Sequence, residues 1–310
     1  MAAAGPLDAA YAGGMDALPG ERTLVLDGGL ATRLEDLGCD LRDELWSARL
    51  LHDDPAVLRR AHRDFFAAGA DVAITASYQA SVPGFTARGL SRGEARALIA
   101  RSVEVAAQAR DEAGGGIVAA SVGPYGAARA DGSEYTGDYG PRAGTADALA
   151  DWHRERWHLL AESGADLLAC ETLPSCTEAQ ALVRLLAETP GVRAWFSFSC
   201  RDGERISDGT PLAECAALLA GHDQVVAVGA NCTAPRHIPE LVSGVRGVPA
   251  VAYPNSGEIW DAGARTWRGA RAPAAFGAAA REWRRAGARL IGGCCRTTPE
   301  HVRRIRAHLD

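Results

Sequence analysis

The sequence predicts an α/β protein that folds as a single-domain (β/α)8 barrel of the TIM type. Two observations lead to this fold class: eight short apolar runs recur along the 310 residues, and amphipathic helical stretches separate them. In addition, the runs are continuously apolar, as in strands that are covered on both faces. Eight such strands alternating with helices favour a closed parallel barrel. An open doubly wound sheet is the alternative, and the lack of a G-x-G-x-x-G motif at a first helix disfavours its dinucleotide-binding form.

The expected strands are, in order, 23–27, 71–77, 116–122, 166–171, 194–200, 225–231, 249–254 and 289–293. The amphipathic stretches that alternate with them are 55–68, 91–113, 146–162, 177–188, 212–220 and 274–286. Three helix-to-strand junctions carry Ala-Gly-Ala or Ser-Gly-Ala, with glycine at Gly69, Gly164 and Gly287. A glycine in the left-handed conformation ends a helix there, so that the strand begins at once.

Composition limits the classes of function. We expect residues 1–20 to form a flexible N-terminal arm and residues 21–310 to form the barrel. The N-terminus lacks the basic start and apolar centre of a signal peptide, and no run of about 18 apolar residues predicts a membrane span. The net charge of −6 argues against a nucleic-acid surface. We therefore predict a cytoplasmic protein that acts on small molecules, with its oligomeric state left open.

The ends of the predicted strands carry the candidate site, because active sites of such barrels lie at the carboxyl ends of the strands. All eight ends carry polar, small or metal-binding residues, which a buried core does not require. They include Asp27, Gly28 and Gly29; Thr75, Ser77 and Tyr78; Ser121; Glu171; Ser199 and Cys200; Asn231 and Cys232; Tyr253 and Asn255; and Cys294 and Cys295. A long loop over 125–144, rich in Gly, Asp and Tyr, is a candidate lid above this rim.

Three cysteines at two strand ends form a candidate metal site. Cys294 and Cys295 are adjacent and follow a glycine pair, and Cys232 ends the apolar run V-V-A-V-G-A-N-C. Adjacent cysteines seldom form a disulfide without strain, but two neighbouring thiolates can bind one metal ion where Gly292 and Gly293 give the backbone freedom to turn. Three thiolates leave the fourth position of a Zn²⁺ ion open, which is a catalytic arrangement. The alternative is that the paired cysteines pack as small hydrophobic side chains.

A zinc ion with three thiolates favours chemistry on a thiol over hydrolysis. It is a weak Lewis acid for water, but a thiol bound to it loses its proton near neutral pH and stays nucleophilic. The five other cysteines, including Cys200, are interpreted as ordinary thiols. The pattern therefore suggests attack of a thiolate on a methyl group carried by a cationic sulfur or nitrogen.

Other rim residues fit an amino-acid substrate. Asp27 and Glu171 can bind an α-ammonium group, although Asp27 can equally cap a helix and Glu171 can pair with an arginine. Gly28 and Gly29 can offer backbone N–H groups to a carboxylate, or can simply form a turn. Asn231 can orient the loop that carries the neighbouring cysteine, or can close a strand-end turn.

Eight sequence stretches together resemble one known family over nearly the whole chain after residue 20. They are L-D-G-G-L-A-T-R-L-E from Leu26, I-T-A-S-Y-Q-A-S from Ile74, S-V-G-P-Y-G-A from Ser121, D-G-S-E-Y-T-G-D-Y from Asp131, E-T-L-P from Glu171, G-A-N-C from Gly229, Y-P-N-S-G-E-I-W-D from Tyr253 and G-G-C-C-R-T-T-P from Gly292. With these motifs the chain resembles the homocysteine S-methyltransferases, in particular the single-module group that uses S-methylmethionine or S-adenosylmethionine as methyl donor.

The resemblance implies a (β/α)8 barrel with Zn²⁺ bound by Cys232, Cys294 and Cys295, and with the homocysteine thiolate as the fourth ligand. It implies that Asp27 and Glu171 meet the amino group of homocysteine. It also places Thr75 and Ser77 near the amino acid. The implied reaction transfers a methyl group from the sulfonium donor to L-homocysteine and gives methionine.

Three alternatives stay open at this point. The acceptor can be another small thiol or a selenol such as selenocysteine, and the donor can be betaine. The protein can also be a binding protein in which zinc has a structural role.

Overall fold

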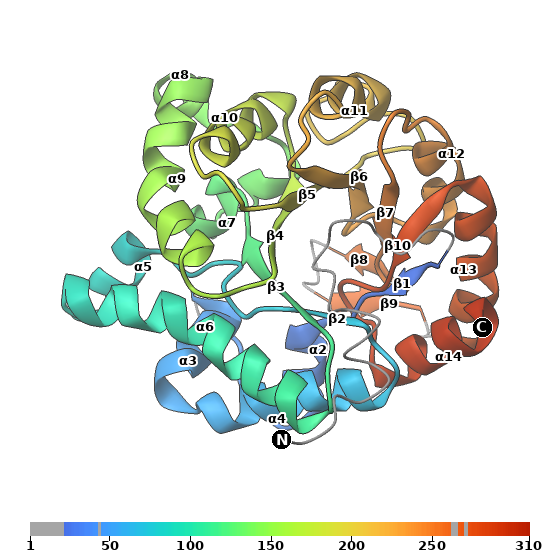
Figure 1. Ribbon diagram of the computed structural model, residues 1–310, viewed down its shortest axis with the longest axis horizontal. Helices are drawn as coiled ribbons and strands as arrows, with labels where there is room; N and C mark the ends of the chain where they lie inside the picture. The colour runs from blue at the N-terminus through green and yellow to red at the C-terminus, as the bar shows by residue number, and fades with distance from the viewer. Residues whose placement is uncertain (1–21, 43–44, 262–265, 270–271) are drawn as a thin grey trace.

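The computed structural model describes residues 22–42, 45–261, 266–269 and 272–310. The expected flexible arm over residues 1–20 lies outside the described residues. Eight strands form a ring, and helices surround it on the outside (Figure 1). Among the helices of the described residues, none has both the length and the apolar character needed to cross a membrane.

All neighbouring strands of the ring are parallel. The strands are β1 (Leu24–Val25), β2 (Val72–Ile74), β3 (Ile117–Val122), β4 (Leu167–Leu173), β5 (Ala194–Phe198), β6 (Val225–Asn231), β7 (Ala250–Tyr253) and β10 (Ala288–Ile291). Their order is β1-β10-β7-β6-β5-β4-β3-β2. The ring closes between β1 and β2, where Leu26 bridges Val72 and the Asp71 N–H donates to the Val25 carbonyl at 2.7 Å. The predicted barrel is thereby confirmed and the open doubly wound sheet is excluded.

Six of the outer helices match the predicted stretches to within one residue at each end. They are α4 (Pro55–Ala67), α6 (Arg92–Glu112), α9 (Ala146–Ala161), α10 (Cys176–Ala187), α11 (Leu212–Leu219) and α13 (Pro273–Ala286). The predicted glycine ends are also confirmed, since φ is +100° at Gly69, +83° at Gly164 and +124° at Gly287. The prediction omitted α12 (Ile238–Ser243) and α14 (Pro299–Leu309), which complete the outer layer.

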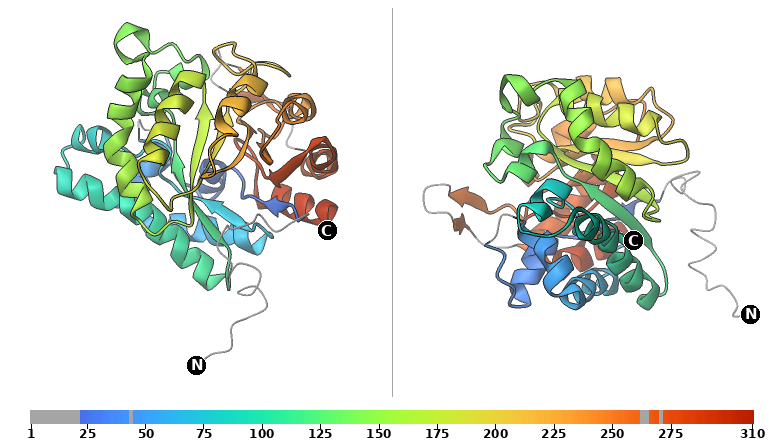
Figure 2. Two further views of the ribbon diagram at one scale, coloured as in Figure 1. Left: turned by 45° about the horizontal axis from the view of Figure 1, so that its top comes forward. Right: turned by 90° about the vertical axis from the view of Figure 1, so that its left-hand side faces the viewer.

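Shorter elements extend the connections between strands and helices. They are α2 (Leu30–Asp36), η2 (Trp46–Arg49), α3 (Leu50–Asp53), α5 (Val82–Thr86), α7 (Tyr125–Arg129), η3 (Ser133–Tyr135), α8 (Gly140–Ala143), η4 (Pro235–His237), and a hairpin of β8 (Ile259–Asp261) and β9 (Thr266–Arg268). The hairpin projects from the body of the barrel (Figure 2, right). The expected loop over 125–144 thus contains α7, η3 and α8.

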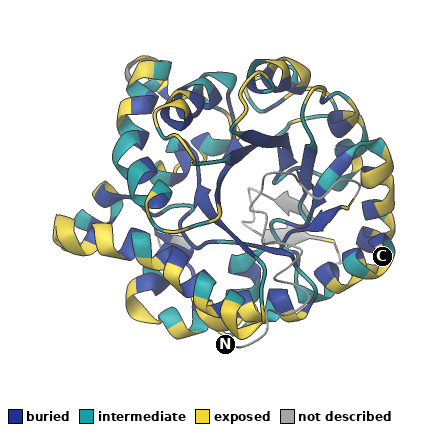
Figure 3. Cartoon of the chain, in the orientation of Figure 1, coloured by how far each residue is buried: buried dark blue, intermediate teal, exposed yellow. Residues whose placement is uncertain are grey.

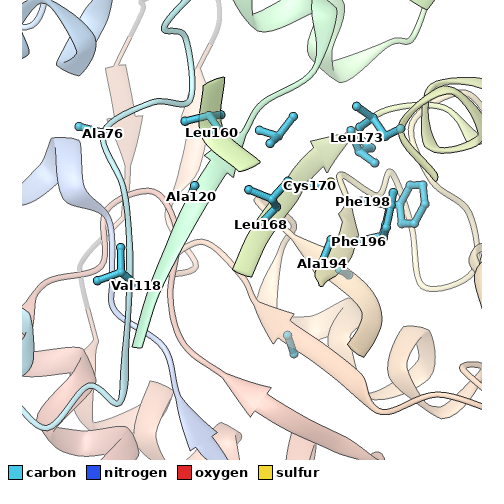
Figure 4. Packing of buried hydrophobic residues seen from close by; sticks show 14 of the residues in the cluster. Ala76, Val118, Ala120, Leu160, Leu168, Cys170, Leu173, Ala194, Phe196 and Phe198 are labelled. Carbon is cyan, nitrogen blue, oxygen red and sulfur yellow. The ribbon is translucent and has the colours of Figure 1, made fainter. Parts of the chain in front are cut away.

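The strands separate two apolar layers, because successive side chains point to opposite faces of each strand. Leu167, Ala169 and Trp195 belong to the cluster inside the ring. Leu168 and Phe196 belong to the larger cluster between strands and helices, part of which is drawn in Figure 4. The strands are accordingly buried while the outer helix faces are exposed (Figure 3). The alternation continues beyond the inner layer of β4, where Glu171 follows Ala169 on the inward face at the carboxyl end.

Candidate active site

The three predicted metal-ligating cysteines lie together. Cys232 follows β6, and Cys294 and Cys295 follow β10. Their sulfur atoms all lie within 4.8 Å of one another, and the Cys232 and Cys295 sulfurs are 3.7 Å apart. A tetrahedral zinc ion with Zn–S bonds of ~2.3 Å places its sulfur ligands ~3.8 Å apart. The donor set therefore has the chemistry and the spacing of a zinc site, and the reading of Cys294 and Cys295 as packing residues is disfavoured.

The thiols also influence one another. Hydrogen bonds from Cys294 and Cys295 lower the pKa of Cys232. The same contact with Cys232 raises the pKa of the Cys294 and Cys295 thiols. Three sulfurs at this spacing cannot all carry a negative charge without a compensating cation. All eight cysteines are free, and Cys200 is not a member of the cluster.

The backbone around the cysteines is held in an unusual conformation. Cys232 has φ of +48°, Thr172 has +58° and Arg296 has +67°, three of four non-glycine residues with positive φ among the described residues. This left-handed conformation costs a side-chain-bearing residue roughly 1 kcal/mol or more, and such strain concentrates at functional sites. Hydrogen bonds hold the strand ends, including one from the Cys294 N–H to the Pro254 carbonyl at 2.8 Å.

Gly292 and Gly293 have a different role from the one predicted. Neither has a positive φ, so the site does not use their freedom to turn. A Cβ atom on Gly292 would lie 2.5 Å from the Leu26 Cβ, and one on Gly293 would lie 2.4 Å from the Thr297 Oγ1. Glycine is required there because the end of β10 packs closely against its neighbours.

Two carboxyl groups share a pocket with the cysteines. Asp27, 1 % exposed, accepts a hydrogen bond from the Ile74 N–H at 2.8 Å. Glu171, 7 % exposed, accepts hydrogen bonds from the Ser121 hydroxyl and, at 3.2 Å, from the Tyr253 hydroxyl. Asp27 does not cap α2, whose N-cap is Gly29.

Burial shifts the protonation of both carboxyl groups. It raises the pKa of Asp27 well above its usual value, and the nearby Glu171 raises it further. Burial likewise raises the pKa of Glu171 to about 7. Among the described residues, the hydrogen-bond partners of the two carboxyl groups are a backbone N–H and two hydroxyls, which disfavours the alternative that Glu171 pairs with an arginine. In general, a buried carboxyl group needs a partner of opposite charge or several hydrogen bonds to stay ionised.

Gly28 and Gly29 line the same pocket. The Gly29 N–H already donates to the Thr297 hydroxyl at 2.9 Å, so it is occupied within the protein. A Cβ atom on Gly28 would lie 2.7 Å from the Phe65 ring, which leaves no space for a side chain. Both glycines therefore shape the wall of the pocket beside Asp27.

Three other predicted residues act on the strand ends and do not line the pocket. Thr75 and Ser77 bond to each other at 2.7 Å, and the Ser77 hydroxyl donates to the Ser121 carbonyl at 2.8 Å. Asn231 accepts from the Thr172 N–H at 2.8 Å and donates to the Thr172 hydroxyl at 2.7 Å. These bonds tie β2 to β3 and β4 to β6.

Tyr135 is a functional candidate that the strand ends did not indicate, whereas Tyr253 was among the predicted strand-end residues. Tyr135 lines the pocket and its hydroxyl lies 3.5 Å from the Cys232 sulfur. Tyr253 accepts a hydrogen bond from the Trp195 ring N–H at 3.1 Å and donates to Glu171. The D-G-S-E-Y stretch was the available signal for Tyr135.

Comparison with known proteins shows the family of the chain. The family model described as "Homocysteine S-methyltransferase" matches residues 24–309. The chain belongs to the homocysteine S-methyltransferase family. It is 53 % identical over 297 residues to homocysteine S-methyltransferase YbgG of Bacillus subtilis, covering 92 % of this chain and 93 % of that protein. It is 50 % identical over 295 residues to homocysteine S-methyltransferase of Escherichia coli, covering 92 % and 94 %.

Members of this family with solved structures share the fold. The metallated form of the homocysteine methyltransferase MmuM from Escherichia coli superimposes with a TM-score of 0.81 at 48 % identity, covering 92 % of this chain and 96 % of that one. The oxidised form of the same protein gives a TM-score of 0.83. The predicted family membership is thereby confirmed.

Proposed function

We propose that this protein transfers a methyl group from a sulfonium donor, S-methylmethionine or S-adenosylmethionine, to the thiol of L-homocysteine and so forms methionine. The observation that carries the proposal is one pocket that holds three cysteine sulfurs within 4.8 Å of one another beside two buried carboxyl groups. A thiol-binding centre next to an ammonium-binding pair matches the two ends of an amino acid with a thiol side chain.

Cys232, Cys294 and Cys295 are proposed to hold a zinc ion. When bound, zinc would lower the pKa of a substrate thiol and keep it nucleophilic at neutral pH. The cysteine sulfurs face a pocket that the two carboxyl groups also line. This arrangement disfavours a purely structural zinc, which is normally ligated fully by protein.

The substrate contacts follow from the pocket. Asp27 and Glu171 are proposed to bind the α-ammonium group of homocysteine, with Gly28 and Gly29 forming the adjacent wall. Thr75, Ser77 and Asn231 are proposed to act indirectly, by fixing the strand ends that carry the contacts.

The chemistry makes few demands for proton transfer. The sulfonium donor leaves as a neutral sulfide, so positioning of the two reactants carries most of the rate. A cationic donor also suits the charge of the site. Glu134, whose pKa is raised by burial and by the nearby Cys232, adds a further acid beside the cysteines.

A cytoplasmic location is part of the proposal.

In the test, the purified zinc-loaded protein is incubated with L-homocysteine and, in turn, with S-methylmethionine, S-adenosylmethionine or betaine. The methionine formed is then measured. We expect methionine with a sulfonium donor and none with betaine. Methionine formation from betaine alone, or from no donor, would contradict the proposal. A parallel set with selenocysteine as acceptor measures the acceptor preference.

Removal of any one of the three cysteines is expected to abolish both zinc binding and turnover. The variants Cys232→Ala, Cys294→Ala and Cys295→Ala are compared with Cys39→Ala, which removes a thiol outside the cluster. Zinc content by elemental analysis and methionine formation are the measurements. A zinc-free variant with normal turnover would refute the proposed role of the metal.

A further inference from the structure

The segment that carries Tyr135 is anchored at both ends by one buried carboxylate. Glu178, in the first turn of α10, is 0 % exposed. Its Oε1 atom accepts a hydrogen bond from the Tyr125 N–H at 2.6 Å, and its Oε2 atom accepts one from the Tyr139 hydroxyl at 2.7 Å. We propose that Glu178 is a positioning residue that holds the segment 125–139 over the thiol centre and so places Tyr135 against Cys232.

A second pair of buried side chains supports Glu178 from behind. His153 and Arg156, on α9, are 0 % and 3 % exposed. Arg156 can only donate hydrogen bonds, so the His153 Nδ1 atom, 3.0 Å from its Nη2, is the acceptor. The His153 Nε2 atom then carries the hydrogen and donates it to the Glu178 Oε1 atom at 2.8 Å. Burial lowers the pKa of His153 to about 4, in agreement with a neutral ring.

The same network reaches the ends of two strands of the barrel. Arg156 donates to the Gly123 carbonyl after β3 and, at 3.3 Å, to the Tyr78 carbonyl after β2. Tyr78 itself lines the pocket. The guanidinium also places a positive charge behind the buried carboxylate, and the neutral ring of His153 connects the two. The anchor of the segment is therefore continuous with the rim.

The position of Tyr135 depends on these anchors together with two contacts of the neighbouring backbone. Tyr135 is 50 % exposed and is the one exposed large hydrophobic residue in the described part of the chain. The backbone beside it is tied down in two places. The Ser199 hydroxyl donates to the Glu134 carbonyl at 3.2 Å, and a Cβ atom on Gly126 would lie 2.4 Å from the Glu134 nitrogen. α7 and η3 thus pack as one unit, which Glu178 joins to α10 at Tyr125 and at Tyr139.

Three variants test the anchor. Tyr139→Phe removes one tether and keeps the ring, and Glu178→Ala removes both tethers. Glu178→Gln keeps one acceptor oxygen, and its amide NH2 group can donate a hydrogen bond to the Tyr139 hydroxyl. Ser102→Ala is the control, because it also removes a buried hydroxyl but lies on α6, where that hydroxyl bonds to the Ile99 carbonyl.

The first readout is hydrogen–deuterium exchange of peptides over 125–139 in the purified protein without substrates, and this readout does not depend on the proposed function. We expect exchange to be roughly tenfold faster in Tyr139→Phe. A factor of this size corresponds to the loss of one hydrogen bond to a buried carboxylate. Glu178→Ala is expected to exceed it, and Glu178→Gln to recover most of the protection. Ser102→Ala is expected to leave these peptides unchanged.

The second readout is kinetic and rests on the proposed function. If the segment forms part of the binding site for the methyl donor, Tyr139→Phe should raise the KM for the donor or lower kcat several-fold. The KM for homocysteine and the zinc content should stay unchanged. Unchanged exchange over 125–139 in both Tyr139→Phe and Glu178→Ala would overturn the proposal. So would a parallel change of both KM values with global stability, which indicates a merely structural role.

Discussion

At the scale of single residues, the two buried carboxyl groups show a conflict between stability and binding. Ionised Glu171 lies in a pocket where, among the described residues, it forms no ion pair. Burial raises its pKa from 4.5 to about 7, so the folded protein binds a proton there that the unfolded chain releases. Glu171 therefore contributes stability below pH 4.5 that is lost as the pH rises through 7. The ammonium group that we propose for this pocket would offset that loss.

Glu171→Gln should accordingly separate stability from function. Relative to the wild type, the substrate-free variant should be more stable at pH 8 than at pH 4.5 by about 3 kcal/mol of unfolding free energy, because each unit of the raised Glu171 pKa is worth ~1.4 kcal/mol. Its homocysteine KM is expected to rise at least about tenfold, because a hydrogen-bonded ion pair is lost. Urea unfolding at the two pH values and steady-state kinetics are the measurements. The exposed Glu104→Gln is the control, and identical pH dependence of stability in wild type and Glu171→Gln would contradict the account.

At the scale of elements, hydrogen bonds of one side chain connect the ends of β4 and β6. Asn231 at the end of β6 bonds to both the N–H and the hydroxyl of Thr172, which has a positive φ at the end of β4. Glu171 precedes Thr172 and Cys232 follows Asn231. One buried amide therefore links the strand end that carries Glu171 to the strand end that carries Cys232.

We expect Asn231→Ala to impair both functions of the rim. It leaves the buried Thr172 N–H without its acceptor, which costs roughly 2–3 kcal/mol of unfolding free energy. The homocysteine KM should rise and the affinity for zinc should fall, as measured by kinetics and by competition with a chelator. Ser91→Ala, which removes the capping box of α6, should cost about 1 kcal/mol without a kinetic effect. If Asn231→Ala lost stability alone, the link between the two strand ends would be wrong.

At the scale of the whole molecule, closure of the barrel depends on a short seam. β1 and β2 share few backbone bonds, and Asp71 reinforces the junction. Its Oδ2 atom accepts from the Val25 N–H at 2.8 Å and from Arg306 of α14 at 2.5 Å, and its Oδ1 atom accepts from Arg22 at 2.8 Å. The last helix of the chain is thereby fixed to the seam where the first strands meet.

Asp71→Ala is expected to lower the unfolding free energy by about 3 kcal/mol, because it leaves a buried strand N–H without its acceptor and removes the buried carboxylate that pairs with the partly buried Arg306. Turnover per folded molecule should stay close to that of the wild type, since Asp71 lies at the amino end of β2, whereas the pocket lies at the carboxyl ends of the strands. Chemical unfolding compared with Asp40→Ala, whose carboxylate pairs with an exposed arginine, is the measurement. Equal stability of the two variants would show that the seam does not depend on Asp71.

The sequence was sufficient for the strands, six outer helices and the three cysteines, because repeated apolar runs and glycine-ended helices are local signals. It did not separate Thr75 from Ile74, of which only Ile74 lines the pocket. Both faces of these strands are covered, so the apolar pattern does not show which face points inward. Tyr135 and Glu178 depend on contacts between distant elements, and such contacts leave no local pattern.

The central claim is a three-sulfur metal centre that accepts the substrate thiol, and zinc K-edge X-ray absorption tests it most directly. Without substrate, we expect three sulfur ligands from Cys232, Cys294 and Cys295. Addition of L-homocysteine should raise the number of sulfur ligands to four, and addition of L-methionine should not. A sulfur count that stays the same when homocysteine binds would contradict the account.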